Sequence, residues 1–260
     1  MSVWSWMLLV LLLPAAGSLD VKNWLTPIVE IIRTEYRIED QFCVAVNIQV
    51  DQNPKELLDV LQYDRYEKVE KVMKDNDDLY IGTKVVAAKP HDGHAEVRVL
   101  HNMDGLFPQI EDNFLVFYTY LSPCAPQCAN PHDDRNILND IEEITGPKYL
   151  GERHALVFGK PCTRLKRCDI TREQLEKSFI NLKAKGFTNI FRCYFQNDVY
   201  QCHSCFSDQN QNVSEVCLEG AESQQGGSAG SSQGVSTGGK RGSAEGTSSS
   251  AAAKRQKGPK

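Results

Sequence analysis

The spacing of apolar residues between Trp24 and Phe195 predicts an alternation of helices and strands. Stretches with helical spacing are separated by short continuous apolar runs, which are typical of buried strands. The sequence therefore predicts an α/β protein with a five-stranded sheet. We expect helices near residues 24–36, 94–104, 134–144 and 171–185, a further amphipathic stretch from Asn53 to about Met73, and strands at Phe42–Ile48, Leu79–Ala87, Asn113–Tyr120, His154–Phe158 and Asn189–Phe195.

The connection between the last two predicted strands indicates their relative direction. Thr171 is a suitable helix N-cap with Glu173 and Gln174 behind it, and Gly186 stands at the end of the same helix. A helix that joins two neighbouring strands of one sheet makes them parallel, through a right-handed crossover. We therefore expect the fourth and fifth strands to be parallel neighbours in a mixed sheet.

Both ends of the chain differ in composition from its middle. Residues 1–17 predict a signal peptide, because an apolar run is followed by small residues suited to cleavage before Ser18. The alternatives are an apolar N-terminal helix and an uncleaved anchor, although the run is short for a membrane span. Residues 221–260 form a Gly/Ser-rich tail with a basic end, a composition typical of disorder.

One domain remains over residues 18–220, with its core at about 42–195. No later segment is long and apolar enough to cross a bilayer, so we expect a secreted protein that does not span a membrane. A sequon at Asn212 predicts N-glycosylation, which fits secretion.

Two short segments carry recognisable chemistry. A His-Ala-Glu motif at residues 94–96 is followed by a Pro-Cys pair at 123–124 and then by Cys128. Zinc deaminases carry H-x-E followed by P-C-x-x-C, with one His and two Cys on the metal and a Glu that binds no metal. This chain has the same order, with one residue more between the cysteines. We expect His94, Cys124 and Cys128 to bind Zn²⁺ and Glu96 to transfer protons.

The residue types suit this metal. Imidazole and thiolate are preferred zinc ligands, and three protein ligands leave a position for water, whose pKa the metal lowers toward neutrality. We expect Cys124 to follow a strand and open a helix, with Cys128 one turn later on the same face. The alternatives are that His94 is a solvated loop residue and that Cys124 and Cys128 form a disulfide.

Residues 93–97 and 122–124 resemble the AID/APOBEC-like branch of the cytidine deaminase superfamily, and the match covers about Phe42 to Phe195. With its leader, the chain is most similar to the secreted members. The resemblance implies a three-layer α-β-α fold and zinc-dependent hydrolysis of the C4 amine of cytosine to give uracil. It further implies exposed bases of single-stranded DNA or RNA as the substrate and defence against foreign nucleic acid as the role.

The chain departs from the family pattern in two places. The connection over residues 53–73 is long where the family has a short turn. It is either an insertion with its own role or a helix that packs on the sheet, and we favour the second. Asn130-Pro131 interrupts the helix that should carry the cysteines, and helical spacing resumes only near Asp134.

The negative charge of the predicted domain leaves substrates other than polynucleotides as alternatives. The net charge is −5; residues 1–17 carry no charged side chain and the tail from residue 221 carries six basic and two acidic ones, or +4, so residues 18–220 sum to −9. Polynucleotide-binding proteins usually present a basic face to phosphate groups. A free nucleoside or nucleotide is therefore the alternative substrate. A catalytically inactive binding protein is a third alternative, although the intact Glu96 argues against it.

Candidate substrate contacts lie near the motif. Tyr120 approaches the site along its strand and could stack on a base, and Ser122 precedes the Pro-Cys pair. The resemblance places a nucleotide-contacting loop after the fourth strand, where Arg164, Lys166 and Arg167 lie. Core packing of Tyr120 and a solvated, disulfide-closed basic loop are the alternatives.

Seven of the nine cysteines lie outside the predicted zinc site. In a secreted protein most of them would pair, and an odd number leaves at least one without an intramolecular partner. Cys162 and Cys168 could close the basic loop. A less favoured alternative is a second zinc site that uses Cys202, His203, Cys205 and Cys217.

Overall fold

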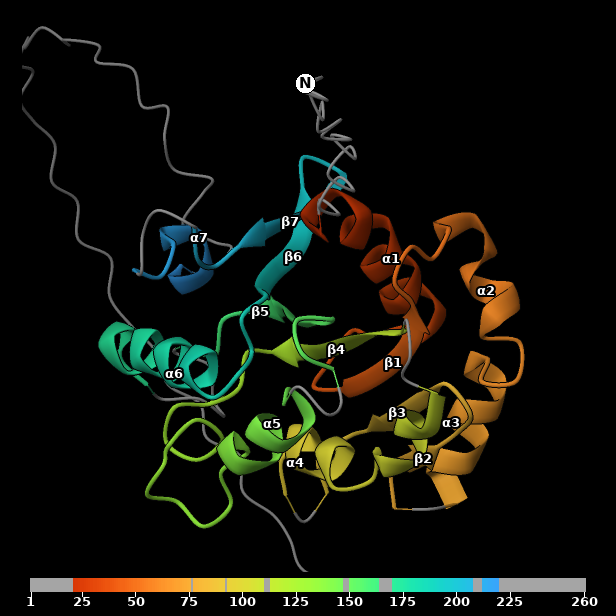
Figure 1. Cartoon of the computed structure of the whole chain (residues 1–260), viewed down its shortest axis with the longest axis horizontal. Coiled ribbons are helices and arrows are strands. Elements are labelled where there is room, and N and C mark those ends of the chain that lie inside the picture. Colours follow the sequence, from red (N-terminus) through yellow and green to blue (C-terminus); the bar gives the residue numbers. More distant parts are fainter. Residues whose placement is uncertain are drawn as a thin grey trace, which may run out of the picture. The chain divides into compact units, whose positions relative to one another are not determined.

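The computed structural model describes residues 21–75, 77–91, 93–109, 113–146, 150–163, 170–207 and 212–219 (Figure 1). The predicted signal peptide, the predicted tail and the basic residues Arg164, Lys166 and Arg167 lie outside the described residues. Within the described ranges, no helix has the length and apolar character needed to span a bilayer.

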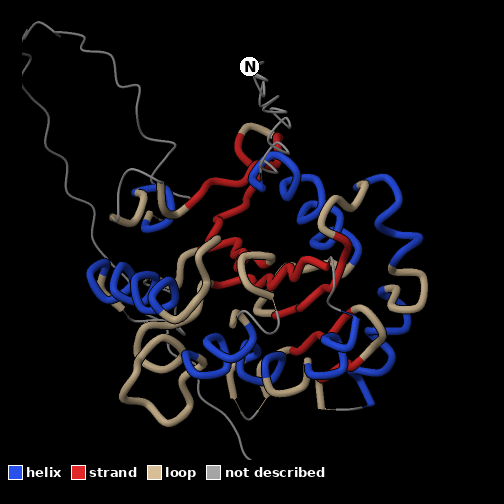
Figure 2. The backbone as a smooth tube through the Cα atoms, viewed as in Figure 1, coloured by secondary structure: helices blue, strands red, loops and turns tan. Residues whose placement is uncertain are grey.

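A seven-stranded mixed sheet has the strand order β2-β3-β1-β4-β5-β6-β7. Figure 2 shows its strands in red at the centre of the described fold, with helices in blue around them. β4, β5 and β6 run parallel, and the other neighbours are antiparallel. The α/β class and the parallel pairing of the fourth and fifth predicted strands, which are β5 and β6, are confirmed, whereas the prediction of five strands is wrong. The strands are β1 Cys43–Gln49, β2 Leu79–Ile81, β3 Val85–Ala88, β4 Asn113–Leu121, β5 His154–Lys160, β6 Ile190–Gln196 and β7 Val199–Ser204.

The predicted second strand is in fact a hairpin of β2 and β3. The backbone N–H groups of Thr83 and Lys84 donate to the Asp64 carboxylate, at 3.1 and 2.7 Å. A Cβ atom at Gly82 would stand 2.1 Å from Asp64 Oδ1, so the turn requires glycine there. Because Asp64 belongs to a distant part of the chain, the apolar pattern of residues 79–87 alone does not predict this turn.

The seventh strand follows a tight turn that apolar periodicity does not predict. Asn197 and Asp198 have φ values of 50° and 62°, the left-handed conformation that a two-residue type I′ hairpin needs. A disulfide between Cys193 and Cys202 joins directly opposed residues of β6 and β7.

The disulfides exclude the less favoured second zinc site. Cys202 pairs with Cys193, and Cys205 pairs with Cys217, so the sulfur atoms which that site needs are already bonded. Cys162 is also disulfide-bonded, and Cys168 lies outside the described residues. Cys43 is buried with a free thiol, in agreement with the odd count.

Successive side chains of the strands point to opposite faces of the sheet and pack into two separate hydrophobic cores. Because helices cover each core, the fold has three layers. Cys43 and Ala45 of β1 point to one face, and Val44 and Val46 point to the other. Helices cover both faces, as Figure 1 shows, in agreement with the expected α-β-α arrangement. The first face packs against α4 (Ala95–Leu100), η2 (Asp104–Gln109), α5 (Leu138–Ile144), α6 (Arg172–Ala184) and α7 (Glu215–Leu218), and the second packs against α1 (Val21–Glu35), α2 (Leu57–Val60), which η1 (Pro54–Glu56) precedes, and α3 (Tyr66–Asp75).

The N-cap predicted for α6 is confirmed. The Thr171 hydroxyl accepts from the Gln174 N–H at 3.3 Å, and the Gln174 side chain accepts from the Thr171 N–H at 2.8 Å. This capping box fixes where α6, the helix in the crossover between β5 and β6, begins.

Asp64 fastens the long connection between β1 and β2 to the rest of the fold. Its fully buried carboxylate accepts from the Tyr80 hydroxyl at 2.6 Å, and its carbonyl oxygen accepts from the Tyr36 hydroxyl at 2.9 Å. With the turn contacts, these bonds join the end of α1, the loop before α3 and the β2–β3 hairpin. The connection therefore packs on the sheet, which is the alternative we favoured.

Replacing Asp64 by Asn is expected to lower the free energy of unfolding by roughly 2–4 kcal/mol, because an amide NH₂ would face buried donors that lose their acceptor. Urea unfolding at neutral pH measures the loss. Asp59→Asn, at an exposed position of α2, is the matched control and should change little. Equal stability of Asp64→Asn and the control would contradict the role of this carboxylate.

His154 provides a pH-dependent contribution to stability. It is fully buried at the start of β5, and burial lowers its pKa from 6.5 to about 4. The unfolded chain therefore takes up this proton near pH 6.5 whereas the folded chain does not, so stability falls as the pH drops from 6.5 toward 4. His154→Gln lacks this titrating group, so its free energy of unfolding does not fall in this way. The difference in free energy of unfolding between wild type and His154→Gln should therefore become smaller by on the order of 2 kcal/mol between pH 7 and pH 5. If urea unfolding gives the same difference between wild type and His154→Gln at pH 7 and pH 5, the lowered pKa of His154 is refuted.

Candidate metal centre

His94 and Glu96 stand at the start of α4. His94 is the N-cap, with extended backbone angles, so its ring projects ahead of the helix. Ala95 packs into the core, and Glu96 lies in the first turn with only 2% of its surface exposed. The two-residue spacing thus places an imidazole and a buried carboxylate on neighbouring sides of one helix end.

Cys124 and Cys128 follow the end of β4, but the expected helix is absent there. Residues 125–129 form turns, in which the Ala129 N–H donates to the Cys124 carbonyl at 3.0 Å. Pro126 and Pro131 lack backbone N–H groups, and the residue before a proline is disfavoured in the helical region. The next helix, α5, begins only at Leu138.

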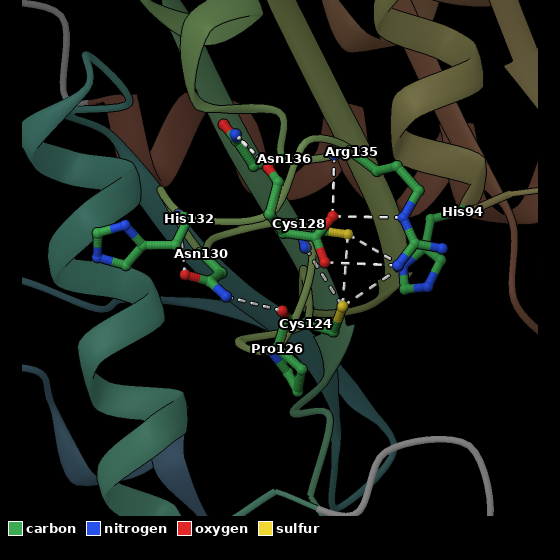
Figure 3. Close-up of polar contacts among 9 residues, drawn as sticks. His94, Cys124, Pro126, Cys128, Asn130, His132, Arg135 and Asn136 are labelled. Atoms are coloured by element: carbon green, nitrogen blue, oxygen red, sulfur yellow. Dashed lines mark hydrogen bonds and ion pairs between the residues drawn. The ribbon is translucent and has the colours of Figure 1, made fainter.

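The loop after Cys128 closes back on itself. The Asn130 side chain donates to the Pro126 carbonyl at 3.1 Å (Figure 3), and the Ile137 N–H donates to the Cys128 carbonyl at 2.9 Å. These bonds fix Cys128 without a helix, so the additional residue between the cysteines is accommodated.

Three potential ligand atoms converge from these two segments, as Figure 3 shows. His94 Nδ1 lies 3.0 Å from Cys128 Sγ and 3.4 Å from Cys124 Sγ, and the two sulfur atoms are 3.5 Å apart. Tetrahedral zinc with Zn–S bonds of about 2.3 Å would hold two thiolates about 3.8 Å apart. The donor set and its spacing therefore fit a zinc ion with small adjustments. Both cysteines are free thiols, so the alternative of a Cys124–Cys128 disulfide is not what the structure contains.

The sulfur atoms differ in their electrostatic environment. A hydrogen bond from the Cys128 thiol and the proximity of His94 lower the pKa of Cys124 to about 4. The hydrogen bond between His94 and Cys124 raises the pKa of His94. The hydrogen bond with Cys124, together with burial, raises the pKa of Cys128. A thiolate beside an imidazole is suited to a cation, and binding of a metal to both sulfur atoms would release the remaining proton.

Glu96 is held at one oxygen and free at the other. Oε1 accepts from Gln41 Nε2 at 3.0 Å and from the Thr119 hydroxyl at 2.8 Å, whereas Oε2 is buried with no hydrogen-bond partner in the described structure. Burial raises the pKa of Glu96. Gln41 and Thr119 were not predicted from the sequence; Gln41 directly precedes the predicted strand Phe42–Ile48, and Thr119 lies within the predicted strand Asn113–Tyr120.

A cavity of about 690 Å³ adjoins this cluster. It is lined by residues of the metal centre, the loop before β1, helix α3, Asp78 before β2 and the segment 89–91 after β3. It therefore reaches from the ligand cluster to the long connection between β1 and β2. The lining includes His94, Glu96, Ser122 and Cys124 near the cluster, Glu39, Asp40 and Gln41 in the loop, and Tyr66, Glu70 and Lys74 on α3.

The residues predicted to contact the substrate differ in their position relative to the cavity. Ser122 lines the cavity, and its Oγ accepts from the Cys162 N–H at 2.9 Å. Tyr120 is half-buried, does not line this cavity, and has Lys160 Nζ 5.2 Å from its ring centroid. Asn212 is exposed, two residues before Ser214, the N-cap of α7. The basic candidates lie outside the described residues.

Comparison with known families identifies the chain. The family model described as Secreted Novel AID/APOBEC-like Deaminase 1 matches residues 22–221. No curated protein and no solved structure matches the chain. The matched segment contains the His94, Cys124 and Cys128 cluster, Glu96 and every described strand. The chain belongs to the Secreted Novel AID/APOBEC-like Deaminase 1 family, within the AID/APOBEC-like deaminases.

Proposed function

We propose that this protein is a secreted, zinc-dependent deaminase that hydrolyses the C4 amine of cytosine to give uracil. The observation that carries the proposal is the buried carboxylate of Glu96, with a free Oε2, beside three convergent ligand atoms at a cavity. A purely structural zinc site has no use for such a carboxylate, whereas hydrolysis needs a group that takes up and returns protons.

His94, Cys124 and Cys128 would hold the zinc ion. When bound, zinc acts as a Lewis acid that activates water for attack on the carbon bearing the amine. Glu96 would take the two protons of that water in turn and deliver one to the ring nitrogen and the other to the departing amine. Its raised pKa suits this exchange, because a proton carrier works best when its pKa lies near the working pH.

The proposed substrate is an exposed cytosine in single-stranded DNA or RNA, in line with family membership. Tyr120, Ser122, Arg164, Lys166 and Arg167 are the proposed contacts. A free nucleoside or nucleotide is the second candidate, because residues 18–220 sum to −9. An inactive binding protein with the same fold is the remaining alternative.

Secretion is proposed together with cleavage of residues 1–17 and glycosylation at Asn212. It is supported by the family description and by the disulfides, which persist in oxidising compartments. Action outside the cell would direct the enzyme at foreign nucleic acid, which makes defence the proposed role.

Removing the proton carrier should abolish turnover but leave the metal. Glu96→Ala is expected to bind one zinc per chain, as wild type does, and to lose at least about 10²-fold in cytosine deamination. Zinc analysis and uracil detection with single-stranded DNA, single-stranded RNA and free cytidine measure both properties and rank the substrates. Glu143→Ala, at an exposed position of α5, is the control. Full activity of Glu96→Ala would contradict the mechanism.

Removing a ligand should abolish both properties. Cys128→Ser is expected to lose tightly bound zinc and deaminase activity together, because serine is a poor zinc ligand at neutral pH. Cys43→Ser changes a buried free cysteine outside the ligand cluster and should keep its zinc. Retention of one zinc in Cys128→Ser would remove this residue from the proposed site.

A further inference from the structure

Gln41 links the two segments that build the metal centre. It lies just before β1, and its side chain reaches both α4 and β4: Nε2 donates to Glu96 Oε1 at 3.0 Å, and Oε1 accepts from the Leu121 N–H at 3.0 Å. Leu121 is the last residue of β4, three positions before Cys124. One amide therefore bridges the carboxylate of the motif and the strand that leads to the cysteines.

The orientation of this amide follows from chemistry. The Leu121 N–H can only donate, so it must face the carbonyl oxygen of Gln41. The amide NH₂ then has to face Glu96, where it is a suitable donor to a carboxylate. The backbone of β4 thus selects which end of the amide Glu96 meets.

Thr119 cannot replace this donor. Its hydroxyl lies 2.8 Å from Glu96 Oε1 and 2.9 Å from the Leu121 carbonyl oxygen, and its single proton serves only one of them at a time. Gln41 Nε2 has two protons, of which one reaches Glu96 and the other points toward Thr119 Oγ1 at 3.4 Å. Gln41 therefore keeps a proton for Glu96 Oε1 whichever acceptor the Thr119 hydroxyl serves.

We propose that Gln41 is a positioning residue: it anchors Glu96 through Oε1 and so leaves Oε2 as the oxygen that exchanges protons with the substrate. Oε2 is buried and without a hydrogen-bond partner in the described structure, and Glu96 and Gln41 both line the cavity. The inference rests on the proposed function for its catalytic consequence, whereas the anchoring itself is a geometric claim.

Gln41→Glu tests the donor specifically. The variant keeps the shape and the acceptor for the Leu121 N–H, but it turns an oxygen toward Glu96 Oε1, which displaces the carboxylate. We expect kcat for the best substrate to fall about 10- to 100-fold while KM changes less than about threefold. Zinc content should match wild type, whereas the urea midpoint should fall because two carboxyl groups would face each other at a partly buried position. Gln62→Glu, an exposed glutamine after α2, makes the same charge change away from the site and should retain wild-type kcat. Gln41→Met, which lacks both charge and donor, should also lower kcat and covers the case that Gln41→Glu fails to fold.

Crystal structures of the zinc-loaded wild type and Gln41→Glu provide a readout that does not depend on activity. The Glu96 carboxylate should contact Gln41 in wild type and leave that position in the variant. An unmoved carboxylate, or an active wild type with unchanged kcat in both Gln41 variants, would overturn the inference. An inactive wild type in which the variant still displaces the carboxylate would refute the proposed function and support the anchoring role.

Discussion

The convergence of one imidazole and two sulfur atoms is the constraint on which the rest of the site depends. His94 comes from the start of α4, and Cys124 and Cys128 come from turns after β4, yet their ligand atoms all lie within 4.8 Å of one another. That proximity requires β3, which leads toward α4, to lie beside β1, and β1 to lie beside β4. The central sheet therefore fixes the distance between two motif segments that are far apart along the chain.

Burial gives Glu96 its chemical character. The residue packs above β1 and β4, where Cys43 is directly opposed to Thr119 and both side chains are fully buried. Burial away from water raises the pKa of the Glu96 carboxyl group. Gln41 and Thr119 form hydrogen bonds to one of its oxygen atoms. The cavity, however, extends to α3, a helix in the connection that Asp64 fastens to the β2–β3 turn. This connection thus shapes the space beside the metal centre as well as packing on the sheet.

Local chemistry made the candidate ligand residues and most strands predictable, whereas the remaining features depend on contacts between residues far apart in the sequence. The His-Ala-Glu and Pro-Cys motifs stand in the sequence itself, and Thr171 could be recognised as an N-cap from its neighbours. The split at Gly82 depends on Asp64, and the role of Gln41 depends on pairing between β1 and β4, so neither can be read from a local pattern. The turn at Asn197 and Asp198 lies beyond the last predicted strand, and it shows as a hairpin only through the left-handed conformation of both residues and the pairing of Cys193 with Cys202.

The most direct test of the central claim traces the oxygen atom that replaces the amine. The zinc-loaded protein is incubated with a cytosine-containing substrate in water labelled with the heavy oxygen isotope, and the base is analysed by mass spectrometry. Hydrolytic deamination predicts uracil that carries one solvent-derived oxygen at C4, formed only while zinc is retained. Cytosine recovered unchanged from single-stranded DNA, single-stranded RNA and free cytidine, with one zinc bound per chain, would contradict the account and leave a metal-binding protein with a deaminase fold.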